Sequence, residues 1–210
     1  MKNRDAKIKV CGMTSLEDTL VAVEAGADAV GFIFYKKSPR SVTIKTVCEI
    51  VDELPPFVDA IGIFVNESAE QINKIADRCK LDRVQLHGDE TPAFCKKIRR
   101  RVIKAIRVKD IQSLKKLSDF RVSGFLLDTF SEDQRGGTGK VFDWNLVHPA
   151  KKYGAVILAG GLTPNNVRQA IHRVKPYGVD VCSGVESQPG IKDHKKVKAF
   201  IKNAKAGLKL

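Results

Sequence analysis

The chain has 210 residues, is 43% hydrophobic and carries 37 Lys and Arg against 24 Asp and Glu, a formal net charge of +13. This apolar content supports a sizeable core and excludes a wholly disordered protein. No apolar run approaches the ~18 residues that a membrane-spanning helix needs, and the N-terminal residues lead into a strand-like segment rather than the apolar stretch of a signal peptide. We therefore expect one cytoplasmic domain over residues 1–210 that crosses no membrane.

An apolar, β-rich run followed by a helical pattern repeats along the chain. The runs are nearly continuous rather than alternating, which is typical of parallel strands that are covered on both faces. The expected strands are Ile8–Cys11, Ala29–Phe34, Ala60–Val65, Arg83–His87, Val102–Ile106, Gly124–Thr129, Ala155–Ala159 and Val179–Cys182.

Between these runs, apolar residues recur at spacings of three and four, which predicts helices. Thr91-Pro92 and Thr163-Pro164 each place a proline at the first helical position behind a hydroxyl cap. The expected helices are Ser15–Ala25, Lys45–Glu53, Glu67–Cys79, Thr91–Arg100, Asp110–Ser118, Trp144–Lys152, Pro164–Lys175 and Asp193–Lys205.

The number of strand–helix units distinguishes two α/β folds. Eight units in this chain give about 26 residues each, at the compact end for a (β/α)8 barrel, also called a TIM barrel. The alternative is a doubly wound open sheet, which usually has five or six units. The count favours a single closed barrel, in which the chemistry lies at the carboxyl ends of the strands and in the loops that follow.

Polar residues or glycine follow almost every expected strand. A turn is a sufficient explanation for Asn66 and Arg107, but not readily for Cys11 and Asp128. The residues at the strand ends are Cys11, Tyr35, Asn66, His87, Arg107, Asp128, Gly160 and Ser183.

Two glycine-containing loops follow the seventh and eighth strands, where barrels of this kind often bind phosphate. Glycine lets backbone N–H groups approach an anion, and a following helix N-terminus adds further donors. A glycine pair alone is more often a turn, but two such loops in adjacent positions favour a phosphate site. We assign this site to Gly160, Gly161, Ser183 and Gly184.

A third glycine cluster, Gly136-Gly137-Thr138-Gly139-Lys140, is not a nucleotide-binding loop. The Walker pattern requires Ser or Thr after the lysine, and Val141 stands there. We expect Ser131–Lys140 to form a mobile loop beside the site, with a lid as one interpretation.

Cys11 and Asp128 end the first and sixth strands, so they would lie on opposite sides of the barrel mouth. A thiol becomes a thiolate base when donors or cations lower its pKa from about 8.5, and an enclosed carboxyl group can donate a proton. Such a pair suits isomerisation better than hydrolysis. A single Cys is usually a packing residue, whereas packing explains Asp128 poorly because an unpaired buried carboxylate is costly.

Three further side chains are candidates for substrate binding. The planar fork of Arg40 suits a carboxylate, although a solvated loop arginine needs no function. His87 either orients the substrate or is a hydrogen-bonded structural histidine. Asp180 either fixes the loops around the phosphate or shapes the surroundings of the substrate amine.

The other cysteines give no functional signal. We expect Cys48, Cys79 and Cys95 in helices, and Cys182 in the last strand, to be packing residues. The five cysteines are odd in number and form no Cys-x-x-Cys pair, and the histidines form no His-Glu-x-x-His, so we expect neither a disulfide framework nor a metal site.

Motifs in a fixed order over Ile8 to about Ala204 resemble the phosphoribosylanthranilate isomerase family. They are Lys9-Val10-Cys11-Gly12-Met13-Thr14, Gly31-Phe32-Ile33-Phe34, Ser38-Pro39-Arg40, Gly62-Ile63-Phe64-Val65-Asn66, Val84-Gln85-Leu86-His87-Gly88, Leu127-Asp128, Gly136-Gly137-Thr138-Gly139-Lys140, Ala159-Gly160-Gly161-Leu162 and Val179-Asp180-Val181-Cys182-Ser183-Gly184-Val185-Glu186.

The resemblance implies a cofactor-independent Amadori rearrangement in tryptophan biosynthesis. It would convert N-(5-phosphoribosyl)anthranilate into 1-(2-carboxyphenylamino)-1-deoxyribulose 5-phosphate. It also implies that Cys11 is the general base, that Asp128 is the general acid, and that Arg40 holds the anthranilate carboxylate. The backbone at Gly160, Gly161, Ser183 and Gly184 would hold the phosphate. Cys182 stands where related sequences often have Ser, and we expect no functional consequence.

Two other readings compete with this one. A sister enzyme on the same scaffold is less favoured, because indole-glycerol-phosphate synthase needs a Lys and Glu arrangement that we cannot place, and histidine-pathway isomerases have Asp where Cys11 stands.

A nucleic-acid-binding module is suggested by the net charge and by the Lys-rich segment 192–198, which otherwise lines the solvent face of the last helix. Only 7% of the residues are aromatic, and no nucleic-acid motif is recognised. We expect a phosphorylated small-molecule substrate, no nucleic acid, and a monomer or homodimer.

Overall fold

The structure is a computed structural model that describes residues 6–129, 144 and 147–207. The expected mobile loop, Ser131–Lys140, lies outside the described residues, as does the glycine cluster within it. None of the helices in the described ranges is long and apolar enough to cross a membrane.

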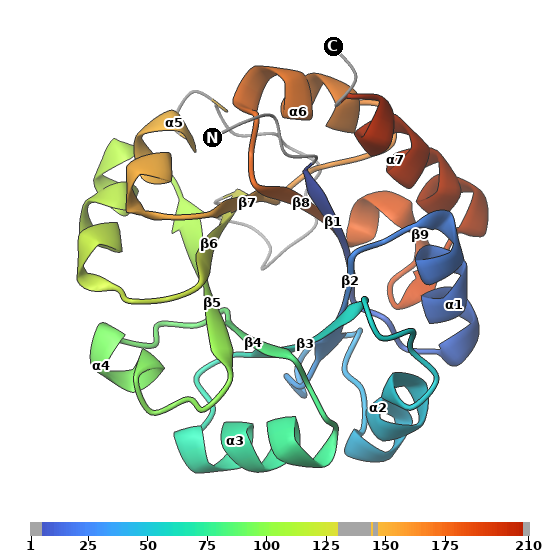
Figure 1. The fold of residues 1–210 in the computed structure, drawn as a ribbon, viewed down its shortest axis with the longest axis horizontal. Coiled ribbons are helices and arrows are strands. Elements are labelled where there is room, and N and C mark those ends of the chain that lie inside the picture. Colours follow the sequence, from blue (N-terminus) through green and yellow to red (C-terminus); the bar gives the residue numbers. More distant parts are fainter. Residues whose placement is uncertain (1–5, 130–143, 145–146, 208–210) are drawn as a thin grey trace.

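Parallel strands β1 to β8 close into a barrel in which β1 pairs with both β2 and β8 (Figure 1). The expected (β/α)8 barrel is therefore confirmed, and each strand lies within two residues of its predicted limits. The barrel strands are β1 (Lys7–Cys11), β2 (Ala29–Ile33), β3 (Asp59–Phe64), β4 (Arg83–Leu86), β5 (Arg101–Val108), β6 (Gly124–Thr129), β7 (Val156–Leu158) and β8 (Gly178–Val181).

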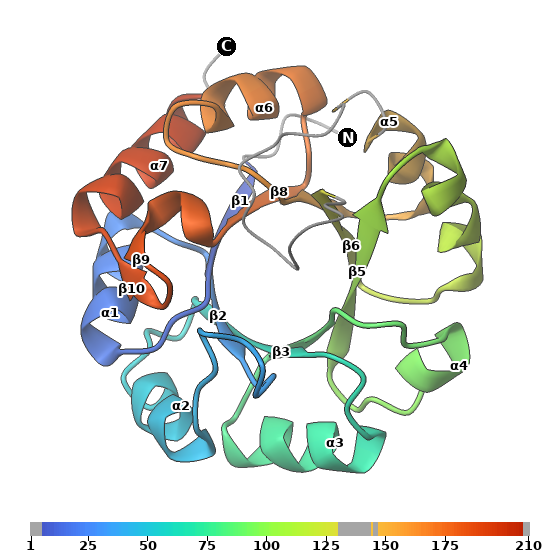
Figure 2. The same ribbon diagram turned by 180° about the vertical axis from the view of Figure 1, so that it is seen from behind.

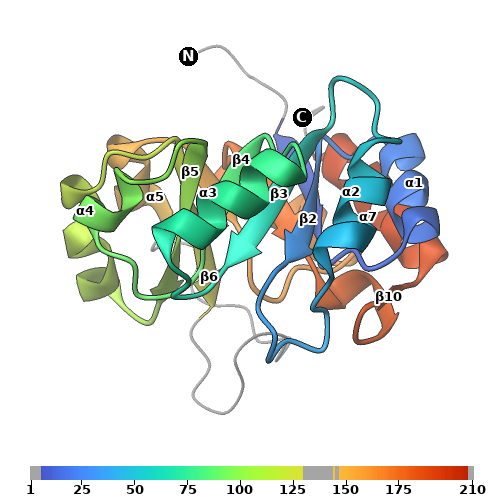
Figure 3. The same ribbon diagram turned by 90° about the horizontal axis from the view of Figure 1, so that it is seen from below.

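Helices surround the barrel as an outer ring (Figures 1 and 3). Most of the apolar core lies between this ring and the strands, while a smaller apolar cluster fills the barrel itself. The α-helices are α1 (Leu16–Ala25), α2 (Ile44–Val51), α3 (Ala69–Arg78), α4 (Pro92–Cys95), α5 (Val147–Ala150), α6 (Val167–Val174) and α7 (His194–Ala206), and the 3-10 helices are η1 (Ile111–Asp119), η3 (Lys151–Tyr153) and η4 (Ser183–Val185).

The α4 helix is much shorter than the expected Thr91–Arg100, although its predicted start is correct, with the Thr91 side chain accepting from the Phe94 N–H. The residues beyond it bind α3 instead of continuing the helix. The Asn73 side chain donates to the Lys97 carbonyl oxygen and accepts from the Arg99 N–H. Tertiary hydrogen bonds thus replace the helical ones.

Three further expectations for helices were wrong in type or extent. The helix expected from Pro164 begins at Val167 with Asn166 as its N-cap, so Thr163-Pro164 does not open it. The segment Ile111–Asp119 is a 3-10 helix, in which the buried Leu114 and Leu117 are three residues apart, matching the three-residue turn. Residues 145–146 of the expected helix Trp144–Lys152 lie outside the described residues, and from Val147 onward the chain forms α5 followed by the short η3.

A small antiparallel hairpin was not expected. It consists of β9 (Glu186–Gln188) and β10 (Ile191–Lys192), inserted between β8 and α7 (Figure 2). The hairpin lies beside the carboxyl ends of β1 and β2, so its side chains reach the end of the barrel that carries the candidate site.

Candidate active site

A cavity of about 410 Å³ opens at the carboxyl ends of the strands, on the face turned toward the viewer in Figure 2. Its volume is in the range of small-molecule sites. Every site residue predicted from the sequence lines this one cavity. They are Cys11, Arg40, His87, Asp128, Gly160, Gly161, Asp180, Ser183 and Gly184.

Cys11 is buried at the end of β1, above a charged pair inside the barrel. Two residues earlier on the same face of the strand, Lys9 donates from Nζ to Asp180 Oδ1 at 2.8 Å. A hydrogen bond from the Cys182 thiol and the positive charges of Lys9 and Lys192 hold the pKa of Cys11 well below its ordinary value, against the opposing effect of burial. This environment favours a thiolate.

Cys182 is therefore more than the packing residue that we expected. It lines the cavity, and its thiol contributes the largest effect that lowers the pKa of Cys11. Hydrogen bonding to Cys11 together with burial raises the pKa of Cys182 well above its usual value, so Cys182 stays protonated and donates. Cys182 faces the cavity because side chains alternate along an extended chain, which places it on the same face as Asp180, two residues earlier.

Asp128 is the penultimate residue of β6 and faces the cavity beside His87. The distance between His87 Nε2 and Asp128 Oδ2 is 3.4 Å, and both side chains are about one-quarter exposed. On the other side of the ring, His87 Nδ1 lies 2.9 Å from Nε2 of the buried Gln85. When Gln85 donates to Nδ1, the proton of a neutral imidazole sits on Nε2 and faces Asp128.

Arg40 lies on the loop after β2, at the rim of the same cavity. Its guanidinium is bound by Glu186, with Nε 2.8 and 3.1 Å from the two carboxylate oxygens and Nη2 2.7 Å from Oε2. Glu186 thus takes one edge of the fork and orients the group. The hydrogen bond with Glu186 raises the pKa of Arg40, so the group is a permanent cation.

The two glycine-containing loops meet as backbone against backbone. Gly160 and Gly161 have φ of 77° and 68°, which favours glycine at both positions. A Cβ on Gly184 would stand only 2.0 Å from the Leu162 carbonyl oxygen. Within the described residues, the N–H groups of Gly160, Gly161 and Gly184 take part in no backbone hydrogen bond, which leaves donors for an anion.

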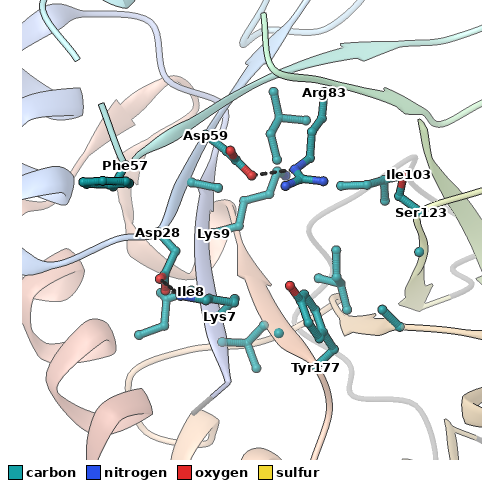
Figure 4. Close-up of a pocket in the computed structure, with 17 residues that line it drawn as sticks. Lys7, Ile8, Lys9, Asp28, Phe57, Asp59, Arg83, Ile103, Ser123 and Tyr177 are labelled. Carbon is teal, nitrogen blue, oxygen red and sulfur yellow. Dashed lines mark hydrogen bonds and ion pairs between the residues drawn. The ribbon is translucent and has the colours of Figure 1, made fainter. Parts of the chain in front are cut away.

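A second cavity lies at the opposite, amino-terminal end of the barrel (Figure 4). The cations there already have partners, since Lys7 binds Asp28 at 2.6 Å and Arg83 binds Asp59 at 2.5 Å. The cations of this cavity are therefore less able to bind an anion than the backbone N–H groups of the glycine loops are. Within the described part of the chain, no three His, Cys, Asp or Glu side chains gather as metal ligands at either end.

Comparison with known proteins decides the family. Residues 8–203 match the family described as N-(5'phosphoribosyl)anthranilate (PRA) isomerase. The chain belongs to this family. A relative named N-(5'-phosphoribosyl)anthranilate isomerase from Geotalea uraniireducens is 57% identical over 199 residues, covering 95% of this chain and 98% of the relative.

Solved structures of family members have the same fold. A phosphoribosyl anthranilate isomerase in complex with reduced 1-(o-carboxyphenylamino)-1-deoxyribulose 5-phosphate is 46% identical, with a TM-score of 0.86, covering 96% of this chain and 99% of its own. The enzyme from Thermotoga maritima, described as dimeric and crystallised as generated monomers, is 44% identical, with a TM-score of 0.85 and the same coverage of both chains.

In this family member, sequence reasoning missed the residues that support the candidate groups. We expected Lys192 on the solvent face of the last helix, but it lies on β10 and its side chain is 0% exposed. Glu186 was no more than part of a motif, although it binds Arg40. One signal in the sequence could have identified Lys192 as different from the other lysines. It stands two residues after Gly190 and directly before Asp193, the N-cap of α7, so it precedes the helix and does not belong to its exposed face.

Proposed function

We propose that this isomerase of tryptophan biosynthesis performs the Amadori rearrangement of N-(5-phosphoribosyl)anthranilate with its own side chains, Asp128 as general acid and Cys11 as general base. The support is one observation: a thiol whose surroundings favour the thiolate shares a cavity with a carboxyl group at the carboxyl end of a strand three places away around the barrel. An acid and a base that flank one substrate are what this reaction needs.

The acid acts first. Asp128 protonates the ring oxygen of the furanose, the bond between that oxygen and the anomeric carbon breaks, and the electron pair of the anthranilate nitrogen forms a protonated Schiff base. Asp128 is left as a carboxylate beside His87 Nε2, 3.4 Å away. A neutral His87 with its proton on Nε2 would stabilise that carboxylate as it forms.

The base acts on the open chain. The Cys11 thiolate removes the proton from C2 of the sugar, and the electron pair moves toward the Schiff-base nitrogen to give an enolamine. Tautomerisation places a proton on C1 and forms the ketone at C2. The net change moves hydrogen within the substrate, so electrons balance without any external oxidant or reductant.

The ends of the substrate carry two negative groups, which the cavity meets with different donors. Arg40 would bind the anthranilate carboxylate through the part of its guanidinium that Glu186 does not occupy. The loops at Gly160, Gly161, Ser183 and Gly184 would bind the phosphate through backbone N–H groups. Asp180 supports this arrangement from below, because it holds Lys9 beneath Cys11.

The test is turnover of freshly prepared N-(5-phosphoribosyl)anthranilate, followed by loss of its fluorescence. The wild-type protein should consume the substrate, and Cys11→Ala should lower kcat by about 10²–10⁴-fold, the usual contribution of a general base. A Cys48→Ala variant, altered on α2 and away from the cavity, should match the wild type. Equal rates for wild type and Cys11→Ala would exclude Cys11 as the base.

We also propose a cytoplasmic location and a monomeric or homodimeric state. All five cysteines are free, which suits a reducing compartment. A family member is described as dimeric. Sedimentation velocity at micromolar concentration would distinguish a 23.2 kDa monomer from its dimer.

A further inference from the structure

A buried ion cluster joins the ends of β1 and β8 to the β9–β10 hairpin. The side chains of Lys192 and Glu186 are 0% and 4% exposed. Lys192 Nζ donates to the Cys11 carbonyl oxygen at 2.7 Å, to Glu186 Oε1 at 2.9 Å and to the Cys182 carbonyl oxygen at 3.5 Å. One ammonium group therefore ties both strand ends to the hairpin.

The same cluster holds Arg40. Glu186, which accepts from Lys192, also binds the Arg40 guanidinium through both of its carboxylate oxygens. The space between these groups is filled closely, because a Cβ on Gly12 would come 2.9 Å from Arg40 Cδ and 3.6 Å from Lys192 Nζ. Cys11, Arg40 and Lys192 are thus linked to one another through hydrogen bonds and close packing.

The charges around Cys11 do not cancel. Three cations, Lys9, Arg40 and Lys192, stand against two carboxylates on this side of the cavity, and a thiolate would balance the excess. The charged or titratable groups facing Cys11 from the packed elements are Lys9, Arg40, Asp180, Cys182, Glu186, Lys192 and, across the cavity, Asp128. Lys192 is among the groups that lower the pKa of Cys11.

We propose that Lys192 is a positioning residue for the isomerisation, which fixes the Cys11 backbone directly and the Arg40 guanidinium through Glu186. This inference rests on the proposed function for the roles of Cys11 and Arg40. Lys192 itself does not touch the substrate, since it lies behind the cavity wall, with its side chain fully buried. Its positive charge favours the thiolate at the base it positions.

A purely structural role for Lys192 predicts loss of stability only, so the test must measure the state of Cys11. The rate at which iodoacetamide alkylates Cys11, measured by peptide mass spectrometry from pH 5 to 9, reports the thiolate fraction without any substrate. The variants are Lys192→Met, which removes the charge at similar volume, and Glu186→Gln, which removes the negative partner. Lys195→Met, at an exposed position on α7, is the matched control.

The two cluster variants should act in opposite directions. Lys192→Met should slow the alkylation of Cys11 at pH 6–7 by about tenfold, the equivalent of one pKa unit, and reach the wild-type rate at alkaline pH. Glu186→Gln should speed alkylation at the same pH, because the excess positive charge grows. In turnover, Lys192→Met should lower kcat and move the acid limb of the kcat–pH profile to higher pH. Lys195→Met should match the wild type.

Two results would overturn the proposal. The first is a Lys192→Met variant that alkylates at the wild-type rate over the whole pH range. The second is a change of the same sign in both cluster variants, which loosening of the fold would produce; Glu186→Gln supplies the comparison if Lys192→Met does not fold. If wild type turns over no phosphoribosylanthranilate while the opposite alkylation shifts persist, the proposed function fails and the role of Lys192 toward Cys11 stands.

Discussion

Lys9 and Asp180 form an ion pair inside the barrel, 2.8 Å apart and directly beneath the candidate base. The two residues are 171 positions apart in the chain and are brought together because β1 pairs with β8. Their side chains are 5% and 9% exposed, so each depends on the other for its charge to be tolerated. This pair and the Lys192 cluster together surround Cys11 with fixed positive charge.

Breaking the Lys9–Asp180 pair should destabilise the protein strongly. Lys9→Met alone should lower the free energy of unfolding by about 3–5 kcal/mol, because it leaves a buried carboxylate without its partner. The double variant Lys9→Met/Asp180→Asn should recover a large part of that loss. Urea unfolding of the two single variants and the double variant measures the coupling, and simple additivity of the single effects would contradict it.

The stability of the protein should also depend on pH through Asp180. Burial raises the pKa of Asp180 to about 6, against the opposing effect of Lys9. The folded state therefore binds this proton more tightly than the unfolded state, whose Asp pKa is about 3.9, and this contribution to stability is lost as pH rises from about 4 to 6. Lys9 stays charged over this range, because Asp180 and Cys11 raise its pKa despite burial.

The measurement is the difference in unfolding free energy between the wild type and Asp180→Asn at several pH values. This difference should decrease as the pH rises from 4 to 6.5 and then level off. A constant difference would show that folding does not raise the pKa of Asp180, and a difference that increases with pH would show that folding lowers it.

Asp128→Asn should stop the reaction at ring opening. The amide cannot donate a proton to the ring oxygen as an acid, so kcat should fall by about 10²–10⁴-fold with little change in KM. Cys11 should still react with iodoacetamide at least as fast as in the wild type, which serves as the control that the site is intact. Turnover within about twofold of wild type would remove Asp128 from the acid role.

Arg40→Ala should act mainly on substrate binding. Loss of a charge-assisted hydrogen bond to the anthranilate carboxylate should raise KM by roughly tenfold or more, since such bonds are worth about 1.5–3 kcal/mol. Because Arg40→Ala also removes one of the two cations that bind Glu186 and leaves Lys192, Arg40→Lys is the comparison that keeps the charge. An unchanged KM in Arg40→Ala, from full progress curves, would refute the carboxylate role.

Gly184→Ala should separate the two phosphate loops. Its Cβ would stand 2.0 Å from the Leu162 carbonyl oxygen, so one backbone must move. We expect a loss of about 1–3 kcal/mol of stability from overpacking and weaker inhibition by inorganic phosphate. Retention of both the wild-type melting temperature and the wild-type phosphate inhibition constant would contradict this geometry.

The barrel and the residues at its mouth could be predicted from the sequence, because each depends on local pattern. Apolar runs that are covered on both faces indicate parallel strands, and the residue that ends a strand must lie at the carboxyl end of the barrel whatever the rest of the chain does. Cys11, Asp128 and the glycine loops were therefore found without coordinates, and they line one cavity.

The contacts that prepare those residues for chemistry were decided by tertiary structure alone. Lys192 and Cys11 are 181 positions apart, and Arg40 and Glu186 are 146 apart, so no local spacing records these bonds. A lysine in a Lys-rich segment has the pattern of a solvated residue, and only the packing of the β9–β10 hairpin against the strand ends buries it. Burial makes its charge effective, because water no longer screens it from the thiol.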